Sequence, residues 1–147
     1  IVPLQTEYFA MEGLAQLLNN VKLIRSSLNP ALELAGIVLT MFDRRNNLHK
    51  QVASEIIEHF EDKVFQSIIP RNIKLSECPS FGKPILLYDI ESKGSEAYLS
   101  LAREIIMSER KVVEAPSVKA EETETLVVEQ YQATTPIVGE QSNSIGL

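Results

Sequence analysis

The hydrophobic positions of this chain follow two alternating patterns, which predict helices interleaved with strands. Three segments have apolar side chains recurring every three or four residues, the spacing of an amphipathic helix: 6–28, 47–60 and 92–106. Three others have the nearly continuous apolar runs typical of strands buried on both faces, the first of them cut short: 1–3, 34–42 and 64–69. This order predicts βαβ units, and therefore an α/β fold with a mainly parallel sheet and flanking helices.

Local signals place the ends of the first and last helices. Thr6 or Glu7 is expected to begin the first helix, and Ser92 or Gly94 the last one. The apolar stripe of the first helix is expected to face the sheet, and its members are Leu14, Leu17, Leu18, Val21, Ile24 and Leu28.

The periodic pattern ends near Ser108. The following residues mix Glu, Thr, Val, Ser, Gln and Pro without a helical or strand-like apolar face, so they bury too little apolar area to offset chain entropy. We therefore expect a folded part at 1–108 and an acidic, disordered tail at 109–147, with a peptide docking site in that tail as the alternative.

Charge and cysteine content narrow the classes of function. The net charge is −6, of which 109–147 contributes −4 and 1–108 only −2. An acidic chain argues against a broad nucleic-acid surface but is compatible with a small basic patch, because local potential governs phosphate contact. The single cysteine, Cys78, excludes an internal disulfide, fits a reducing cytoplasm and is expected to fill a small site. The chain contains no run of 18 apolar residues, so the sequence predicts no membrane span.

Candidate functional residues follow the second and third predicted strands. The loop after residue 42 carries Arg44 and Arg45, and the loop after residue 69 carries Arg71 and Lys74. Because the carboxyl ends of parallel strands meet at one edge of a sheet, Arg45 and Lys74 can form one basic patch there. The alternative is that both loops are ordinary solvated turns, the first capping the next helix through Asn46 or Asn47.

Other polar side chains give weaker signals. His49 and His59 lie too far apart on one helix to share a metal, and both are expected at the surface or at a helix end. Glu77 and Asp89 have no partner recognisable from the sequence. The pair Tyr8-Phe9 is expected in the core.

Several motifs, in this order, resemble the ParA/Soj chromosome-partitioning ATPases. They read PLQTEYFAMEGL at 3–14, LTMFDRRNNL at 39–48, IPRN at 69–72, and YD followed by SKGSEAY within 88–98. The resemblance covers residues 1 to about 106 and corresponds to the carboxyl-terminal part of the family's deviant-Walker, P-loop NTPase-like domain. The glycine-rich lysine loop of that domain does not occur in the 147 residues, so we expect a fragment of a longer reading frame.

The resemblance implies specific roles. An intact family member binds ATP and Mg²⁺, closes into a homodimer, binds DNA non-specifically and hydrolyses ATP when a ParB-like centromere-binding partner stimulates it. Pro70, Arg71 and Asn72 resemble the element that lies against adenine, whereas Arg45 and Lys74 match positions that contact DNA. Family members often carry arginine at the position of Lys74. Lysine keeps the positive charge there but cannot bind a phosphate through two nitrogens, as a guanidinium does. The implied location is cytoplasmic and nucleoid-associated.

Two other functional classes are compatible with parts of this sequence. A truncated, non-enzymatic module that binds DNA or a partner is the main alternative, and this chain alone is not expected to hydrolyse ATP. The related division-site-positioning ATPases bind membrane through a basic amphipathic helix, whereas 109–147 is acidic. We therefore expect no membrane partner.

Overall fold

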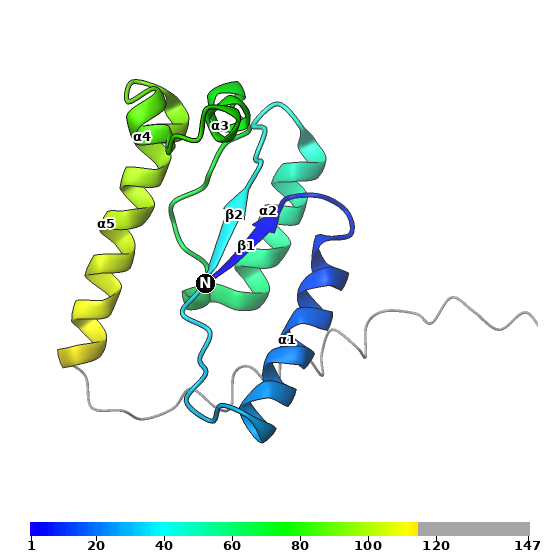
Figure 1. Cartoon of the computed structure of the whole chain (residues 1–147). Helices are drawn as coiled ribbons and strands as arrows, with labels where there is room; N and C mark the ends of the chain where they lie inside the picture. Colours follow the sequence, from blue (N-terminus) through cyan, green and yellow to red (C-terminus); the bar gives the residue numbers. More distant parts are fainter. Residues whose placement is uncertain (115–147) are drawn as a thin grey trace, which may run out of the picture.

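The computed structural model describes residues 1–114, with side chains described to residue 108. Figure 1 shows the elements in chain order: β1 Val2–Gln5, α1 Ala10–Ser27, β2 Ile37–Thr40, α2 Asn47–Phe60, η1 Glu61–Lys63, α3 Ile73–Glu77, η2 Cys78–Phe81, α4 Ile85–Tyr88 and α5 Lys93–Glu114. The strands β1 and β2 pair in parallel, from Val2 opposite Ile37 to Gln5 opposite Thr40. The predicted α/β class with a parallel sheet is confirmed.

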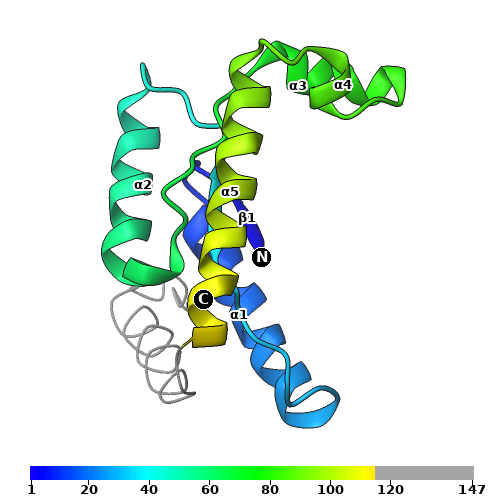
Figure 2. The same ribbon diagram turned by 90° about the vertical axis from the view of Figure 1, so that its left-hand side faces the viewer.

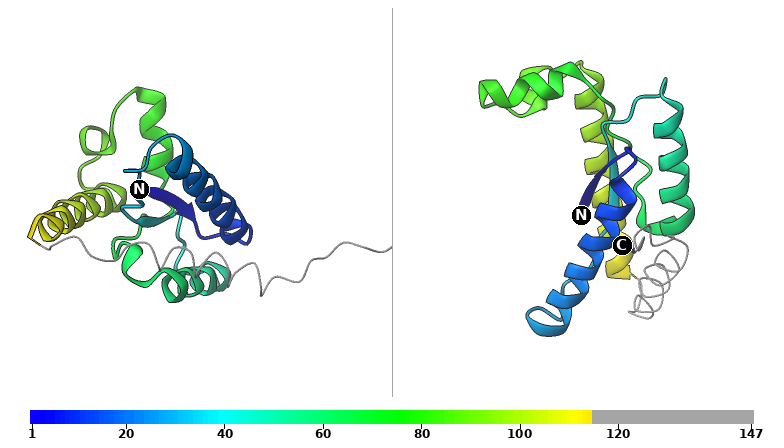
Figure 3. Two further views of the ribbon diagram at one scale, coloured as in Figure 1. Left: turned by 90° about the horizontal axis from the view of Figure 1, so that it is seen from below. Right: turned by 90° about the vertical axis from the view of Figure 1, so that its right-hand side faces the viewer.

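Strand β2 is buried on both faces, as its continuous apolar run predicts. Ile37 and Leu39 point to one face, where they pack in a cluster with side chains of α1 and α2. Val38 points to the opposite face and packs with Leu101 of α5. The sheet therefore lies between α1 and α2 on one side and α5 on the other, an arrangement visible when the molecule is turned (Figure 3).

The third predicted strand, 64–69, is extended but bulged. Its first bond to β2 runs from the Phe65 amide to the Ile37 carbonyl, at 2.9 Å. In a regular parallel ladder the Ser67 amide would bond the Leu39 carbonyl next. The Ile69 amide makes that bond instead, at 2.9 Å. Two extra residues are therefore accommodated here, and the prediction of a regular strand was wrong.

A carboxylate from α5 accepts from two backbone amides within the bulge. The Glu104 side chain accepts from the Gln66 amide at 2.6 Å and from the Ser67 amide at 2.9 Å. Burial raises the pKa of Glu104, but the hydrogen bonds from Ser67 and Gln66 outweigh it, so the pKa lies below its ordinary value. This contact, 37 residues away in sequence, fixes α5 against the bulge.

Replacing Glu104 with Gln is expected to lower the free energy of unfolding by about 1–3 kcal/mol at neutral pH, because charge-assisted bonds to two amides are lost. The pKa of Glu104 is lower in the folded protein than in the unfolded chain, where it lies near 4.5. The stabilisation by the Glu104 carboxylate is therefore present above pH 4.5 and is lost as the pH falls through the pKa of the folded protein. Urea unfolding at pH 7 and pH 3 measures both effects. The difference between the two proteins should be smaller at pH 3 than at pH 7, and the exposed Glu58→Gln control should match the parent at both pH values.

Helix α1 differs from the prediction at its start and on its apolar face. It begins at Ala10, three residues after Glu7, whose carbonyl accepts from the Ala10 amide. Leu14 and Leu18 are buried, but three other members of the predicted stripe are exposed: Leu17, Ile24 and Leu28. Within the described residues α1 packs mainly beside β1, so only one line of its side chains is covered.

The segment expected as an irregular loop after residue 70 forms three short helices, α3, η2 and α4, in a lobe at the carboxyl end of the sheet (Figure 2). Gly82, with φ of +62°, ends η2 in the left-handed conformation that glycine adopts without steric cost. Gly94, in the first turn of α5, allows the lobe to approach closely. A Cβ there would lie 2.6 Å from the Leu75 Cγ atom.

The last helix runs beyond its expected end. Ser92 caps α5 by accepting from the Ser95 amide at 3.1 Å, as predicted, but the helix continues to Glu114, across the expected boundary at 108. The remainder of the expected tail, 115–147, lies outside the described residues. Within residues 1–114, no helix has both the length and the apolar character required to cross a bilayer.

Candidate functional site

The predicted site residues converge at the carboxyl end of the sheet, at the top of Figure 1. The backbone of Phe42, just beyond β2, bonds to the third extended segment in both directions. Its amide donates to the Ile69 carbonyl at 3.2 Å, and its carbonyl accepts from the Arg71 amide at 3.0 Å. These bonds fix the start of the 43–46 loop beside the start of α3, so the predicted juxtaposition of the two loops is observed.

Arg45 is held by the neighbouring carboxylate of Asp43. Asp43 accepts from the Arg45 amide at 3.0 Å, from Nε at 3.1 Å and from Nη2 at 2.9 Å. These bonds place the pKa of Asp43 well below its usual range and raise that of Arg45. The Arg45 side chain remains 90% exposed, and its Nη1 edge makes no bond within the described residues. Arg45 is therefore oriented but open to an anion.

Two residues of α2 stabilise the loop that carries Arg45. Asn46 caps the helix as predicted, accepting from the Leu48 amide at 3.0 Å. His49 was expected at the surface or at a helix end, and it does lie in the first turn of α2, but it is buried rather than exposed, and its Nδ1 accepts from the Asp43 amide at 3.1 Å. Because Nδ1 accepts, the neutral ring carries its proton on Nε2. The sequence places this histidine in the first helical turn but does not reveal its bond to the Asp43 amide, six residues earlier.

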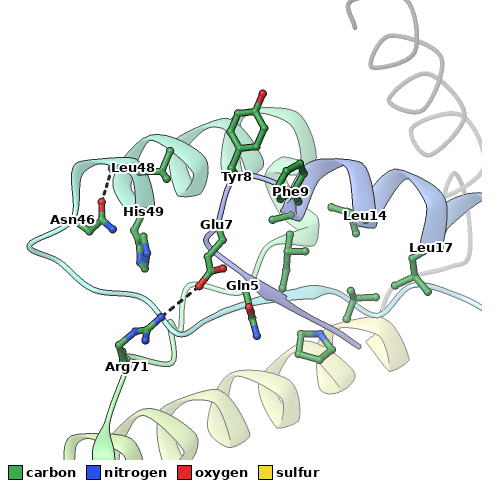
Figure 4. A pocket seen from close by; sticks show the side chains of 15 residues that line it. Gln5, Glu7, Tyr8, Phe9, Leu14, Leu17, Asn46, Leu48, His49 and Arg71 are labelled. Atoms are coloured by element: carbon green, nitrogen blue, oxygen red, sulfur yellow. Dashed lines mark hydrogen bonds and ion pairs between the residues drawn. The ribbon is translucent and has the colours of Figure 1, made fainter. Parts of the chain in front are cut away.

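Arg71 links the third segment to the end of β1. Its Nη2 lies 3.4 Å from Glu7 Oε1, and both side chains are about half exposed (Figure 4). Asn72 caps α3 through Oδ1, which accepts from the Lys74 amide at 2.8 Å, while its side-chain nitrogen makes no hydrogen bond within residues 1–114. Pro70, which precedes them, is half-buried. Three strand ends thus contribute to one polar edge.

Lys74 lies in a small cluster formed by α3, η2 and α4. Its Nζ lies 3.0 Å from Glu77 Oε2 and 5.7 Å from the centre of the Tyr88 ring. The Tyr88 hydroxyl donates to the same Glu77 oxygen at 2.9 Å, and its ring packs on Phe81 with centroids 5.2 Å apart. The hydrogen bonds from Lys74 and Tyr88 lower the pKa of Glu77.

Sequence reasoning missed the partners of this cation. Glu77 was taken as an isolated acid, whereas it pairs with Lys74 three residues earlier on the same helical face, a spacing that does favour such a pair. Tyr88 reaches the cluster from another helix and could not have been found from local spacing. Cys78 is buried beside them, as predicted.

An apolar hollow of about 780 Å³ lies below this polar edge, between β1, the start of α1 and the start of α2 (Figure 4). Tyr8 and Phe9 line it as an edge-to-face pair, with ring centroids 5.1 Å apart. Both are more than 70% exposed, so their predicted place in the core was wrong. They lie in the turn that delays the start of α1. Arg71 is the only cation among the lining residues.

Comparison with known proteins identifies the relationship. Residues 4–85, more than half of the chain, match the family described as the CobQ/CobB/MinD/ParA nucleotide binding domain, which supports the predicted P-loop NTPase-like fold.

Three relatives are similar over much of the chain. The chromosome partitioning protein ParA of Caulobacter vibrioides is 60% identical over 109 residues, which are 74% of this chain and 41% of the relative. The sporulation initiation inhibitor protein Soj of Bacillus subtilis is 53% identical, over 71% of this chain and 42% of the relative. The chromosome-partitioning ATPase Soj of Thermus thermophilus is 47% identical, over 72% and 43%.

The chain thus spans about two fifths of the length of these relatives. The residues matched by the family model include β2 and both loops of the polar edge. The chain belongs to the CobQ/CobB/MinD/ParA nucleotide-binding family and, within it, to the ParA/Soj proteins.

Proposed function

We propose that this chain is part of a chromosome- or plasmid-partitioning ATPase, and that it carries the loops by which that ATPase binds DNA without reading sequence. The observation that supports this most is the junction at Phe42, which holds the Arg45 loop beside the Arg71–Lys74 segment. Arg45 is presented on an exposed turn and Lys74 on the short helix α3, and both bind phosphate as charges rather than reading base edges.

Binding of DNA by two copies of the protein explains how so few cations on each copy suffice to hold it. One protomer places Arg45 and Lys74 at the polar edge, and two phosphate contacts give weak binding. ATP-dependent formation of a homodimer doubles the number of cations, so that avidity couples the nucleotide state to DNA retention. A ParB-like partner that stimulates hydrolysis then releases the DNA. In this scheme the protein acts on the nucleoid in the cytoplasm.

The adenine side of the nucleotide site is proposed for Pro70, Arg71 and Asn72. The free side-chain nitrogen of Asn72 can donate to a ring nitrogen, and half-buried Pro70 supplies apolar surface for a purine. ATP supplies the phosphoryl group that is hydrolysed. No group of three metal-ligating side chains occurs among residues 1–114, so we assign no Mg²⁺ ligands to this part of the chain. We expect the purified 147-residue chain to release no phosphate from Mg²⁺-ATP, and measurable turnover would contradict this.

Equilibrium binding to labelled duplexes of unrelated sequence tests the DNA proposal directly. We expect similar affinities for all sequences, because phosphate contacts carry no sequence information. Affinity should fall with salt along a logarithmic slope of roughly −0.9 for each phosphate neutralised. Binding that depends on sequence, or that does not respond to salt, would reject the proposal.

A further inference from the structure

We propose that Glu77 competes with DNA phosphate for Lys74, and that Tyr88 keeps this internal competitor in place. The inference rests on the proposed function, because it concerns the regulation of the same DNA-binding surface. Glu77 thereby sets how tightly the chain holds DNA, although it does not itself contact the phosphate.

The geometry of the cluster places the carboxylate where a phosphate would bind. Lys74 Nζ and the Tyr88 hydroxyl both bond to a single oxygen, Glu77 Oε2, at 3.0 and 2.9 Å. Tyr88 comes from α4 and packs on Phe81, so the hydroxyl is anchored from outside α3. Glu77 is therefore held by a tertiary contact as well as by its helical neighbour.

Both partners of the ion pair are accessible to a ligand. The side chain of Lys74 is 46% exposed and that of Glu77 is 38% exposed. A phosphate approaching Lys74 meets the negative charge of Glu77 at close range, and this repulsion weakens its binding. Acid does not relieve this competition near neutral pH, because the pKa of Glu77 lies below its ordinary value.

The ion pair at Arg45 has a different consequence. Asp43 occupies the Nε–Nη2 edge of the guanidinium and leaves the Nη1 edge for a phosphate. The lysine presents its three donors from a single nitrogen, so a phosphate bound there lies close to the Glu77 carboxylate and is repelled by its charge. Asp43 therefore orients its cation, whereas Glu77 competes for its own.

The test measures duplex DNA affinity of the 147-residue chain and its variants as a function of salt. Glu77→Gln should bind roughly fivefold more tightly at about 50 mM salt, which is the effect of removing one charge a few ångströms from a phosphate in water. Tyr88→Phe should give a smaller gain of the same sign, because the ring packing is kept and only the hydroxyl is lost. Glu58→Gln, an equal change of charge on α2, should bind like the parent.

A double variant separates competition from a general charge effect. In a background of Lys74→Ala, the Glu77→Gln change should lose most of its effect on affinity, since the cation that it frees is absent. If Glu77→Gln binds no more tightly than the parent while Lys74→Ala weakens binding, the competition is refuted and the proposed function stands. If neither Lys74→Ala nor Arg45→Ala weakens binding, the proposed function itself fails.

Discussion

Replacing Arg45 and Lys74 together with alanine is expected to lower the affinity for duplex DNA by roughly ten- to a hundredfold at about 50 mM salt. Each cation contributes one phosphate contact at the polar edge and releases a counterion when DNA binds. The double variant should therefore also show a shallower logarithmic salt slope, by roughly 0.9 for each cation removed. Fluorescence anisotropy of a labelled duplex, titrated at several salt concentrations, gives both quantities.

The matched control is Lys22→Ala with Arg103→Ala, which removes one lysine and one arginine from exposed positions on α1 and α5. If DNA affinity depended on net charge alone, this control would weaken binding as much as the double variant. Our account predicts a much smaller change. If the control and the Arg45–Lys74 double variant lost DNA affinity equally, the 43–46 and 71–74 segments would not be the DNA site.

Replacing Leu39 with alanine is expected to cost about 2–5 kcal/mol of the free energy of unfolding, because it leaves a cavity in the centre of the packed face. Leu39 is fully buried in β2 and belongs to the cluster shared with α1 and α2. Its carbonyl also accepts from the Ile69 amide, so a backbone shift there would disturb the strand ends that position the site. Urea unfolding followed by circular dichroism measures the change.

Leu17→Ala removes the same atoms from a partly exposed position of α1 and is the natural comparison. We expect it to change the free energy of unfolding by less than about 0.5 kcal/mol. A large loss at Leu17 would mean that this face of α1 is covered in solution. A small loss at Leu39 would contradict the packing described for β2.

The elements that the sequence predicts well are those specified by their own residues. The apolar run through Ile37 and Leu39 predicts β2 because both faces of the strand are covered. The cap at Asn46 is a local hydrogen bond and follows from residue type alone. The placement of the segment just after β2 next to Arg71 followed from topology, since parallel strands end at the same edge.

The features that the sequence did not predict depend on contacts between distant segments. In the bulge of the third segment, two backbone amides donate to Glu104, on a helix far along the chain. Tyr88 reaches Glu77 from a separate helix. None of these partners leaves a periodic or motif signal.

The central claim is that the Arg45 and Lys74 loops form one surface for duplex DNA. An NMR titration of the isotope-labelled 147-residue chain with a short duplex of arbitrary sequence tests it most directly. We predict that the backbone amide signals of residues 43–46 and 71–77 shift together, with a single dissociation constant, and that added salt reverses the shifts. Shifts confined to one loop, or centred on residues outside both, would contradict the claim.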